Sequence, residues 1–164
     1  MRVLICPDKF AGTLSAPEVA AAVATGWHDV APRDDAVTRP LADGGPGFVD
    51  VLAAALDGRR LPVATVDPLG RPAAGEVLVV GDTAYVESAQ ACGLHLLSAD
   101  ERDPKAATSY GLGLLVAAAV EAGVRRIVVG LGGSATNDAG AGMLAALGAV
   151  PLDAAGYAPP YGSA

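Results

Sequence analysis

The stretch GLGGSATNDAGAGM, residues 130–143, follows the short apolar run Ile127-Val128-Val129. From Gly130 to Thr136, Leu131 is the only residue with a side chain larger than that of Ser or Thr. The chain therefore leaves the apolar run through nearly bare backbone. A short continuous apolar run that ends in a turn signal is typical of a strand buried on both faces. Since residues 141–147 then have the composition of a helix, the stretch predicts a strand, a glycine-rich loop and a helix in succession.

The same succession is predicted twice in residues 1–58. Residues 3–6 form a short apolar run, and Ser15 precedes a proline and an acid, which predicts the N-cap and first turn of a helix. A second, weaker strand is predicted over 36–41, and it ends at the loop ADGGPG. Apolar residues then recur at helical spacing over 48–56. This part of the chain is therefore predicted to be a βαβα segment.

The pattern changes after residue 58. Three short runs of β-like composition, 61–66, 74–80 and 83–86, are separated by the turn signals PLGRP and GD. Short runs joined by tight turns predict an antiparallel meander rather than another βα unit. A helix is predicted next, over about 108–122, ahead of the apolar run described above.

Together these elements predict an α/β protein with a mostly parallel sheet, helices on both of its faces and a short antiparallel β-meander. The predicted segments are a βαβα segment at 1–58, the meander at 59–98 and an αβα segment at 99–164. The last segment ends in a Pro/Gly-rich tail with no further strand to pack against, so we expect the sheet to be unfinished.

Composition and charge narrow the possible functions. The chain is 52% hydrophobic and 18% charged, which excludes an intrinsically disordered protein. Its net charge of -7 argues against nucleic-acid binding, which needs clustered Lys and Arg. Backbone N–H groups can still bind a phosphorylated ligand without net positive charge. The N-terminus MRVLICPDKF does not resemble a signal peptide and no apolar run is long enough to cross a bilayer, so we expect a cytoplasmic protein without a membrane partner.

Three of the predicted strands are followed by an acid, namely Asp8, Asp43 and Asp138, and each acid lies near glycines. Because the carboxyl ends of parallel strands meet at one edge of a sheet, we predict that the three acids share one cleft. Phosphoryl transfer uses such parts: N–H groups for phosphate, carboxylates for Mg²⁺, and a carboxylate that positions or deprotonates a hydroxyl. We also predict that the backbone from Gly132 to Thr136 directs its N–H groups into the cleft, and that the next helix begins near Asp138.

Two alternatives stay open. Gly130, Gly132 and Ala135 match the dinucleotide-binding pattern G-x-G-x-x-A, and Asp153 lies 21 residues after Gly132, as a ribose-binding acid would. The polar residues after Ala135 argue against it, because a dinucleotide fold begins its helix there with apolar packing positions. The second alternative is a noncatalytic remnant that keeps the fold. Asp and Gly would then occupy these loops because they form turns and cap helices.

Six blocks of the chain resemble, in sequence and in order, the bacterial type I glycerate kinases: PDKFAGTLSA (7–16), LADGGPGF (41–48), DPLGRP (67–72), YVESAQACGL (85–94), TSYGLG (108–113) and GLGGSATNDAGAGMLAALGA (130–149). GGSATNDAGAGM is the most specific part. The resemblance implies that D-glycerate is phosphorylated with ATP and Mg²⁺, usually to 2-phosphoglycerate, in a cleft between two α/β lobes. It leaves the oligomeric state open.

The resemblance also assigns candidate site residues. The catalytic candidates are Asp8, Lys9, Asp43 and Asp138, and of these Asp43 and Asp138 would hold Mg²⁺. The candidates for binding substrate or phosphate are Gly44, Gly45, Gly132, Gly133, Ser134, Thr136 and Asn137. Which loop takes glycerate and which takes ATP stays open.

The chain departs from the family pattern in two positions and in length. Ala11 stands where the family commonly has a lysine, and Pro46 stands where it commonly has an acid. Family members are considerably longer than 164 residues, so the chain resembles their N-terminal portion. We therefore expect that these residues alone do not turn over glycerate.

Overall fold

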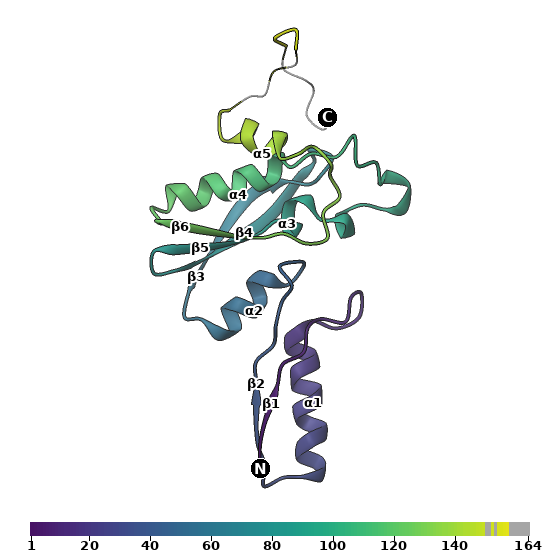
Figure 1. Cartoon of the computed structure of the whole chain (residues 1–164), viewed down its shortest axis with the longest axis vertical. Helices are drawn as coiled ribbons and strands as arrows, with labels where there is room; N and C mark the ends of the chain where they lie inside the picture. Colours follow the sequence, from purple (N-terminus) through teal and green to yellow (C-terminus); the bar gives the residue numbers. More distant parts are fainter. Residues whose placement is uncertain (150–151, 153, 158–164) are drawn as a thin grey trace.

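The computed structural model describes residues 1–149, 152 and 154–157. Its elements form two units that follow one another along the long axis of the molecule (Figure 1). The first unit, at the end that carries the N-terminus, contains β1 (Arg2–Ile5), α1 (Ala16–Val30) and β2 (Asp35–Thr38). β1 and β2 pair in parallel, with Arg2 opposite Asp35 and Ile5 opposite Thr38.

The beginning of α1 follows the sequence signal. The Ser15 hydroxyl accepts a hydrogen bond from the N–H of Glu18 at 3.4 Å, and the Glu18 carboxylate accepts one from the N–H of Ser15 at 2.7 Å. This reciprocal capping box satisfies two N–H groups that a helix end otherwise leaves free. The predicted N-cap is confirmed, and Val19 and Ala20 in the first turns of α1 are buried.

The second unit is built on a four-stranded sheet in the order β3-β4-β5-β6. Its strands are β3 (Arg59–Val66), β4 (Pro72–Val80), β5 (Thr83–Glu87) and β6 (Arg126–Gly130). β3, β4 and β5 pair antiparallel, which confirms the predicted meander. β6 pairs with β5 in parallel, with Gly130 opposite Glu87, so the ends of these two strands lie side by side.

Helices cover both faces of this sheet. They are α2 (Phe48–Ala55) on one face and α3 (Ala89–Cys92) and α4 (Tyr110–Glu121) on the other. α5 (Ala141–Ala146) packs against α4, and 3₁₀ turns lie at Leu94–Leu96 and Ala99–Glu101. α4 packs on one face, where its side chains join those of the strands and α3 in one apolar core. The core residues are Val77, Ala84, Val86, Ala91, Cys92, Leu112, Leu115 and Ala119. Because alternate strand residues point to opposite faces, Leu78 and Tyr85 face the other side, where α2 contacts β4 and β5. There Phe48 and Tyr85 meet edge to face, with ring centroids 6.3 Å apart.

The α/β class, the helices on both faces and the meander agree with the sequence-based expectation. The parallel strands, however, are divided between two sheets, so the ends of β1 and β2 belong to a different sheet from the end of β6. The second strand ends at Thr38 rather than Leu41. The division into segments 1–58, 59–98 and 99–164 stays a prediction, and the Pro/Gly-rich tail lies largely outside the described residues.

The helix predicted over residues 141–147 is confirmed as α5, but it does not reach back to Asp138 as expected. α5 begins at Ala141 because the two residues before it, Ala139 and Gly140, have left-handed backbone conformations, with φ of +52° and +80°. An α-helix needs negative φ, so it can begin only after them. Within the described part of the chain, no helix has the length and apolar character needed to cross a membrane.

Candidate active site

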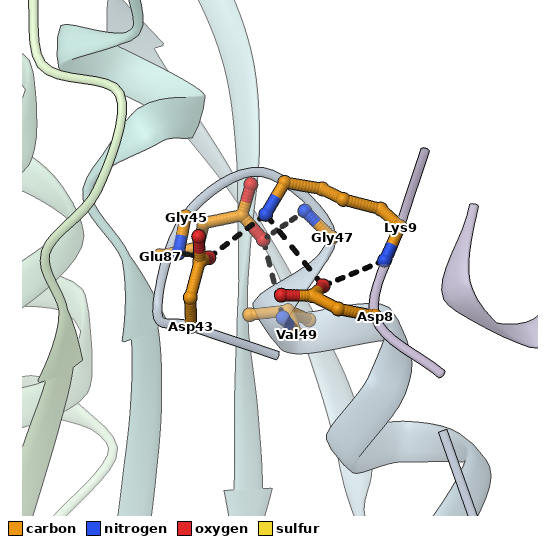
Figure 2. A network of polar contacts seen from close by, with 7 residues as sticks. All are labelled: Asp8, Lys9, Asp43, Gly45, Gly47, Val49 and Glu87. Carbon is orange, nitrogen blue, oxygen red and sulfur yellow. Dashed lines mark hydrogen bonds and ion pairs between the residues drawn. The ribbon is translucent and has the colours of Figure 1, made fainter. Parts of the chain in front are cut away.

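The first group of candidate residues meets around the Lys9 ammonium group. Its Nζ donates a hydrogen bond to Asp43 Oδ1 at 2.8 Å and lies 3.7 Å from Asp8 Oδ1 (Figure 2). The backbone N–H of Lys9 also donates to Asp8 Oδ1, at 2.6 Å. Asp8 and Lys9 follow β1 and Asp43 follows β2, so the parallel pairing of these strands brings the three side chains together, as predicted for Asp8 and Asp43.

The electrostatics of this cluster favour its charged forms. The hydrogen bond to Asp43, helped by the negative charge of Asp8, raises the pKa of Lys9 above its usual value although partial burial opposes the shift. The hydrogen bond from Lys9 and one from the N–H of Gly45, at 2.8 Å, lower the pKa of Asp43. Asp43 is therefore an ionised carboxylate and a weak base.

The loop after β2 touches the loop after β6 through bare backbone. A Cβ added at Gly132 would lie 2.6 Å from Gly45 Cα, and one added at Gly44 would lie 3.2 Å from the N of Leu131. A Cβ does not approach backbone atoms to 2.6 Å, so glycine is required at Gly132, and a φ of +87° favours glycine at Gly44. The contact joins the end of the first unit to the end of β6, and it explains why the predicted binding residue at position 132 is a glycine.

Sequence reasoning missed Glu87, the last residue of β5. Its Oε2 accepts hydrogen bonds from the N–H groups of Gly47 at 3.2 Å and Val49 at 3.1 Å, at the beginning of α2 (Figure 2). The carboxylate therefore caps α2 from the neighbouring sheet, and burial raises its pKa although these two hydrogen bonds oppose the shift. An acid at the end of a predicted strand, followed by Ser88, was the signal that could have drawn attention to it.

The loop after β6 is pinned to its neighbours at alternate residues. Gly133 accepts a hydrogen bond from the N–H of Leu94 at 2.7 Å, and Ala135 donates to the carbonyl of Cys92 at 2.7 Å. The predicted row of free N–H groups is thus interrupted at Ala135. Elsewhere from Gly132 to Thr136, the backbone N–H groups have no acceptor among the described residues.

Asp138 is held apart from the Lys9 cluster. Its two oxygens accept hydrogen bonds from the Ser109 N–H at 2.8 Å, the Ser109 hydroxyl at 2.7 Å, the Gly140 N–H at 3.0 Å and the Gly142 N–H at 3.1 Å. Burial acts to raise its pKa, but these hydrogen bonds together outweigh burial and lower it. Asp138 therefore holds the start of α5 against the start of α4, and the structure does not bring it to Asp8 and Asp43.

Two pockets border the contact between the glycine loops. The first, of about 290 Å³, is lined by the loop after β1, including Asp8 and Lys9, and by residues 46, 47, 50 and 51. The second, of about 310 Å³, is lined by Asp138, Asn137, Thr136 and Ser134 together with the starts of α3 and α4. Of the predicted site residues, Asp8 and Lys9 line the first pocket and four residues of the loop after β6 line the second, whereas Asp43 and the candidate glycines line neither.

The donors available for a divalent cation are few. Within the described residues, no group of three or more His, Cys, Asp or Glu is arranged to hold a metal ion. Asp43 and Asp8 keep their second carboxylate oxygens free of hydrogen bonds, whereas both oxygens of Asp138 are engaged. Mg²⁺ is commonly held by one or two carboxylates plus substrate phosphates, which the Asp8 and Asp43 pair fits and Asp138 does not.

The dinucleotide alternative is not supported by this geometry. In that motif the third small residue opens the helix that binds the pyrophosphate. Here Ala135 is hydrogen-bonded to Cys92, and the helix begins only at Ala141. Asp153, the candidate ribose-binding acid, lies outside the described residues.

Carboxylates, a lysine and glycine loops that meet between two α/β units are the parts of a phosphotransferase, and the chain's relatives are of this class. The chain belongs to the glycerate kinase family, whose model matches residues 3–164.

Named relatives agree with this membership. The chain is 45% identical over 158 residues to a glycerate kinase of Bacillus subtilis (strain 168), covering 95% of this chain and 41% of the relative. It is 44% identical over 158 residues to a glycerate 2-kinase of Escherichia coli (strain K12), covering 95% of this chain and 42% of the relative. A crystal structure assigned as glycerate kinase 2 of Salmonella typhimurium LT2 superposes with a TM-score of 0.81 at 42% identity, over 99% of this chain and 44% of that one. The chain thus spans about two fifths of the length of these relatives.

Proposed function

We propose that the protein carrying this chain transfers the γ-phosphoryl group of ATP to D-glycerate, and that the product is 2-phosphoglycerate. Membership of the glycerate kinase family supports the reaction, and the name of the Escherichia coli relative supports the 2-position. The observation that carries the proposal is the Lys9 ammonium group, held between two carboxylates where the two glycine loops meet.

The two carboxylates would have different roles. Asp43 has a lowered pKa and is held by Lys9 and Gly45, so it suits a permanently charged anchor rather than a base. Asp8 has one oxygen on the Lys9 N–H and the other free, so it is the better candidate to position the substrate hydroxyl and take its proton. Lys9 would neutralise charge on the phosphoryl group in flight.

Nucleotide phosphates would bring Mg²⁺ to Asp43, with Asp8 nearby, and the ion would supply further neutralisation of phosphate charge. Gly44 and Gly45 allow the phosphates to approach bare backbone. Asp138 would act indirectly, by holding the loop that carries Ser134, Thr136 and Asn137 in place. An acidic chain with a net charge of -7 supports a small-molecule substrate rather than nucleic acid. The use of ATP would place the reaction in the cytoplasm.

The test uses a fusion of residues 1–164 to the C-terminal part of the Bacillus subtilis relative. We expect glycerate-dependent ADP release in a coupled assay with D-glycerate, ATP and Mg²⁺, and a phosphorus NMR spectrum that identifies the 2-phosphate. Lys9→Met should lower kcat by about 10²-fold or more, as is typical when one charge-stabilising donor is lost. Lys105→Met, at an exposed lysine far along the chain, is the matched control and should leave kcat unchanged. If the fusion gives no glycerate-dependent ADP release while the intact relative does, the proposed function is wrong.

A further inference from the structure

The second pocket, beside Asp138, contains polar side chains that the proposed chemistry does not yet use. They come from three places: the end of β5, the start of α4 and the loop after β6. Some of these groups are satisfied by other protein atoms and some are not. The difference shows which of them build the pocket wall and which are left for a ligand.

The wall-building groups are Ser109, Thr136 and Asp138. The Ser109 hydroxyl donates to Asp138 at 2.7 Å and accepts the N–H of Met143 at 2.9 Å. The Thr136 hydroxyl donates to the carbonyl of Ala107 at 2.8 Å and accepts the N–H of Asp138 at 3.2 Å. Because both hydroxyls donate and accept within the protein, they hold the wall and have no remaining hydrogen to offer a ligand.

Ser88 is the group left without a partner. Its residue is 1% exposed, and among the described residues its Oγ is the buried side-chain polar atom that has no hydrogen bond. Its backbone is fixed, because its N–H donates to the carbonyl of Gly130 at 3.1 Å. A buried hydroxyl without a partner costs folding free energy, so a fold that keeps one there is expected to use it.

The turn from β5 into α3 places Ser88 beside this pocket. Glu87 is the last residue of β5, and Ser88 directly follows it as the N-cap of α3, where the backbone turns out of the strand. Glu87 reaches α2 on one face, whereas Ser88 lines the second pocket on the face covered by α4.

Two further groups on the loop after β6 are available. The side chains of Ser134 and Asn137 are exposed and have no hydrogen bond among the described residues. Gly133 and Ala135 point their carbonyl and N–H toward residues 92–94, and backbone direction alternates along an extended segment. The N–H groups of Ser134 and Thr136 therefore point away from residues 92–94.

Among the described residues, the pocket offers no formal positive charge, so an anion bound here would be held by neutral donors. Its described lining contains no Lys, Arg or His, and its one carboxylate, Asp138, is saturated by the hydrogen bonds given above. Hydroxyl, amide and backbone N–H donors bind carboxylate and phosphate oxygens without a formal positive charge.

We propose that this pocket is an oxyanion subsite, in which the Ser88 hydroxyl donates to a carboxylate or phosphoryl oxygen of the bound substrate. The proposal rests on the proposed function for the choice of anions, because D-glycerate carries a carboxylate and ATP carries phosphates. Ser134 and Asn137 would complete the donor set from the rim. The subsite lies beside the Lys9 cluster but shares no lining residue with the pocket around it.

The test measures ligand binding and stability in the 164-residue chain and compares two hydroxyl deletions. Ser88→Ala removes the buried hydroxyl that has no partner. Thr65→Val removes a buried hydroxyl that donates to the carbonyl of Gly111 at 2.8 Å and does not line the pocket, and it is the matched control. Inorganic phosphate, D-glycerate and uncharged glycerol are titrated separately and followed by amide chemical shifts, and unfolding is followed by circular dichroism.

We expect Ser88→Ala to weaken anion binding by about tenfold, the factor that corresponds to one hydrogen bond, without lowering the unfolding temperature. Thr65→Val should lower the unfolding temperature and leave binding unchanged. Binding of phosphate alone would assign the subsite to a phosphoryl group, and binding of D-glycerate alone would assign it to the carboxylate.

Several results would overturn the proposal. One is that the wild-type chain binds neither anion, and another is that glycerol binds as tightly as the anions. The others are that Ser88→Ala binds the anions as tightly as wild type, or that it is destabilised as much as Thr65→Val. The kinase assay on the fusion is independent of these outcomes. Phosphate binding that depends on Ser88, without ADP release by the fusion, would contradict the proposed function but support the subsite. ADP release by the fusion, without anion binding that depends on Ser88, would support the proposed function and contradict the subsite.

Discussion

The contact between the two glycine loops is the most direct feature to perturb. Gly132→Ala adds one methyl group that would lie 2.6 Å from Gly45 Cα and 2.8 Å from Gly45 N. Carbon atoms pack at about 3.5–4.0 Å, so the two loops would have to separate by roughly 1 Å. Both neighbouring atoms belong to the backbone and cannot rotate away. Overpacking of this kind typically costs about 1–3 kcal/mol.

Gly26→Ala is the matched control, because it makes the same chemical change in α1, where the added Cβ would meet nothing within 4 Å. Alanine is favoured over glycine inside a helix by about 1 kcal/mol, so this variant should be more stable than wild type. The two variants should therefore differ by about 2–4 kcal/mol in the free energy of unfolding, with opposite signs relative to wild type.

Urea unfolding of the 164-residue chain, followed by circular dichroism, measures this difference. In the fusion used for the kinase assay, Gly132→Ala should also lower kcat, because the displaced loops carry Asp43 and Ser134 away from each other. Gly26→Ala should leave kcat unchanged. If Gly132→Ala is as stable as wild type and equally active, the loops do not meet through bare backbone and the reasoning fails.

Three further predictions concern the acids and the chain as a whole. Asp138→Asn should destabilise the fold by about 2–4 kcal/mol, since charge-assisted hydrogen bonds are lost, whereas Asp100→Asn at an exposed carboxylate should change little. Because its folded pKa lies below 3.8, the contribution of Asp138 is complete at neutral pH and is lost as pH falls through that lowered value; unfolding measured from pH 6 to pH 2 checks this. Burial raises the pKa of Glu87 above 4.5, so the folded state binds more protons than the unfolded state just above that pH and stability falls as pH rises through this window. Glu87→Gln should remove this slope, and an unchanged slope in the variant would assign it to another group. Residues 1–164 alone should show no glycerate-dependent ADP release, because orientation between two sides of a cleft can supply about 7–11 kcal/mol of barrier lowering; turnover comparable to that of the fusion would contradict this.

Local signals identified most of the elements of this fold. The capping box at Ser15, the meander over residues 59–87 and the apolar run before Gly130 depend on neighbouring residues, so the pattern of neighbours was enough to predict them. The expectation that the last helix reaches back to Asp138 failed because nothing in an alanine signals the left-handed conformation of Ala139.

The candidate site was only partly visible in the sequence. Asp8 and Asp43 were correctly paired because both follow strands of one parallel pair, and strand order fixes where their carboxylates lie. Asp138 looked equivalent, but it follows a strand of another sheet and its oxygens are used within the protein. Glu87 went unnoticed because its partners, Gly47 and Val49, lie 38 or more residues away.

The sequence by itself therefore determined the α/β class, the capped first helix, and the candidate acids and glycines that match the family motifs. These depend on interactions between residues close together in the chain and on motifs that can be read in order. Only the tertiary structure decided which acids meet, because strands β1 and β6 belong to separate sheets that touch through Gly44, Gly45 and Gly132. It also decided that the Ser88 hydroxyl is buried without a hydrogen-bond partner. Whether a buried hydroxyl has a partner depends on how distant segments pack around it, which no local sequence pattern encodes.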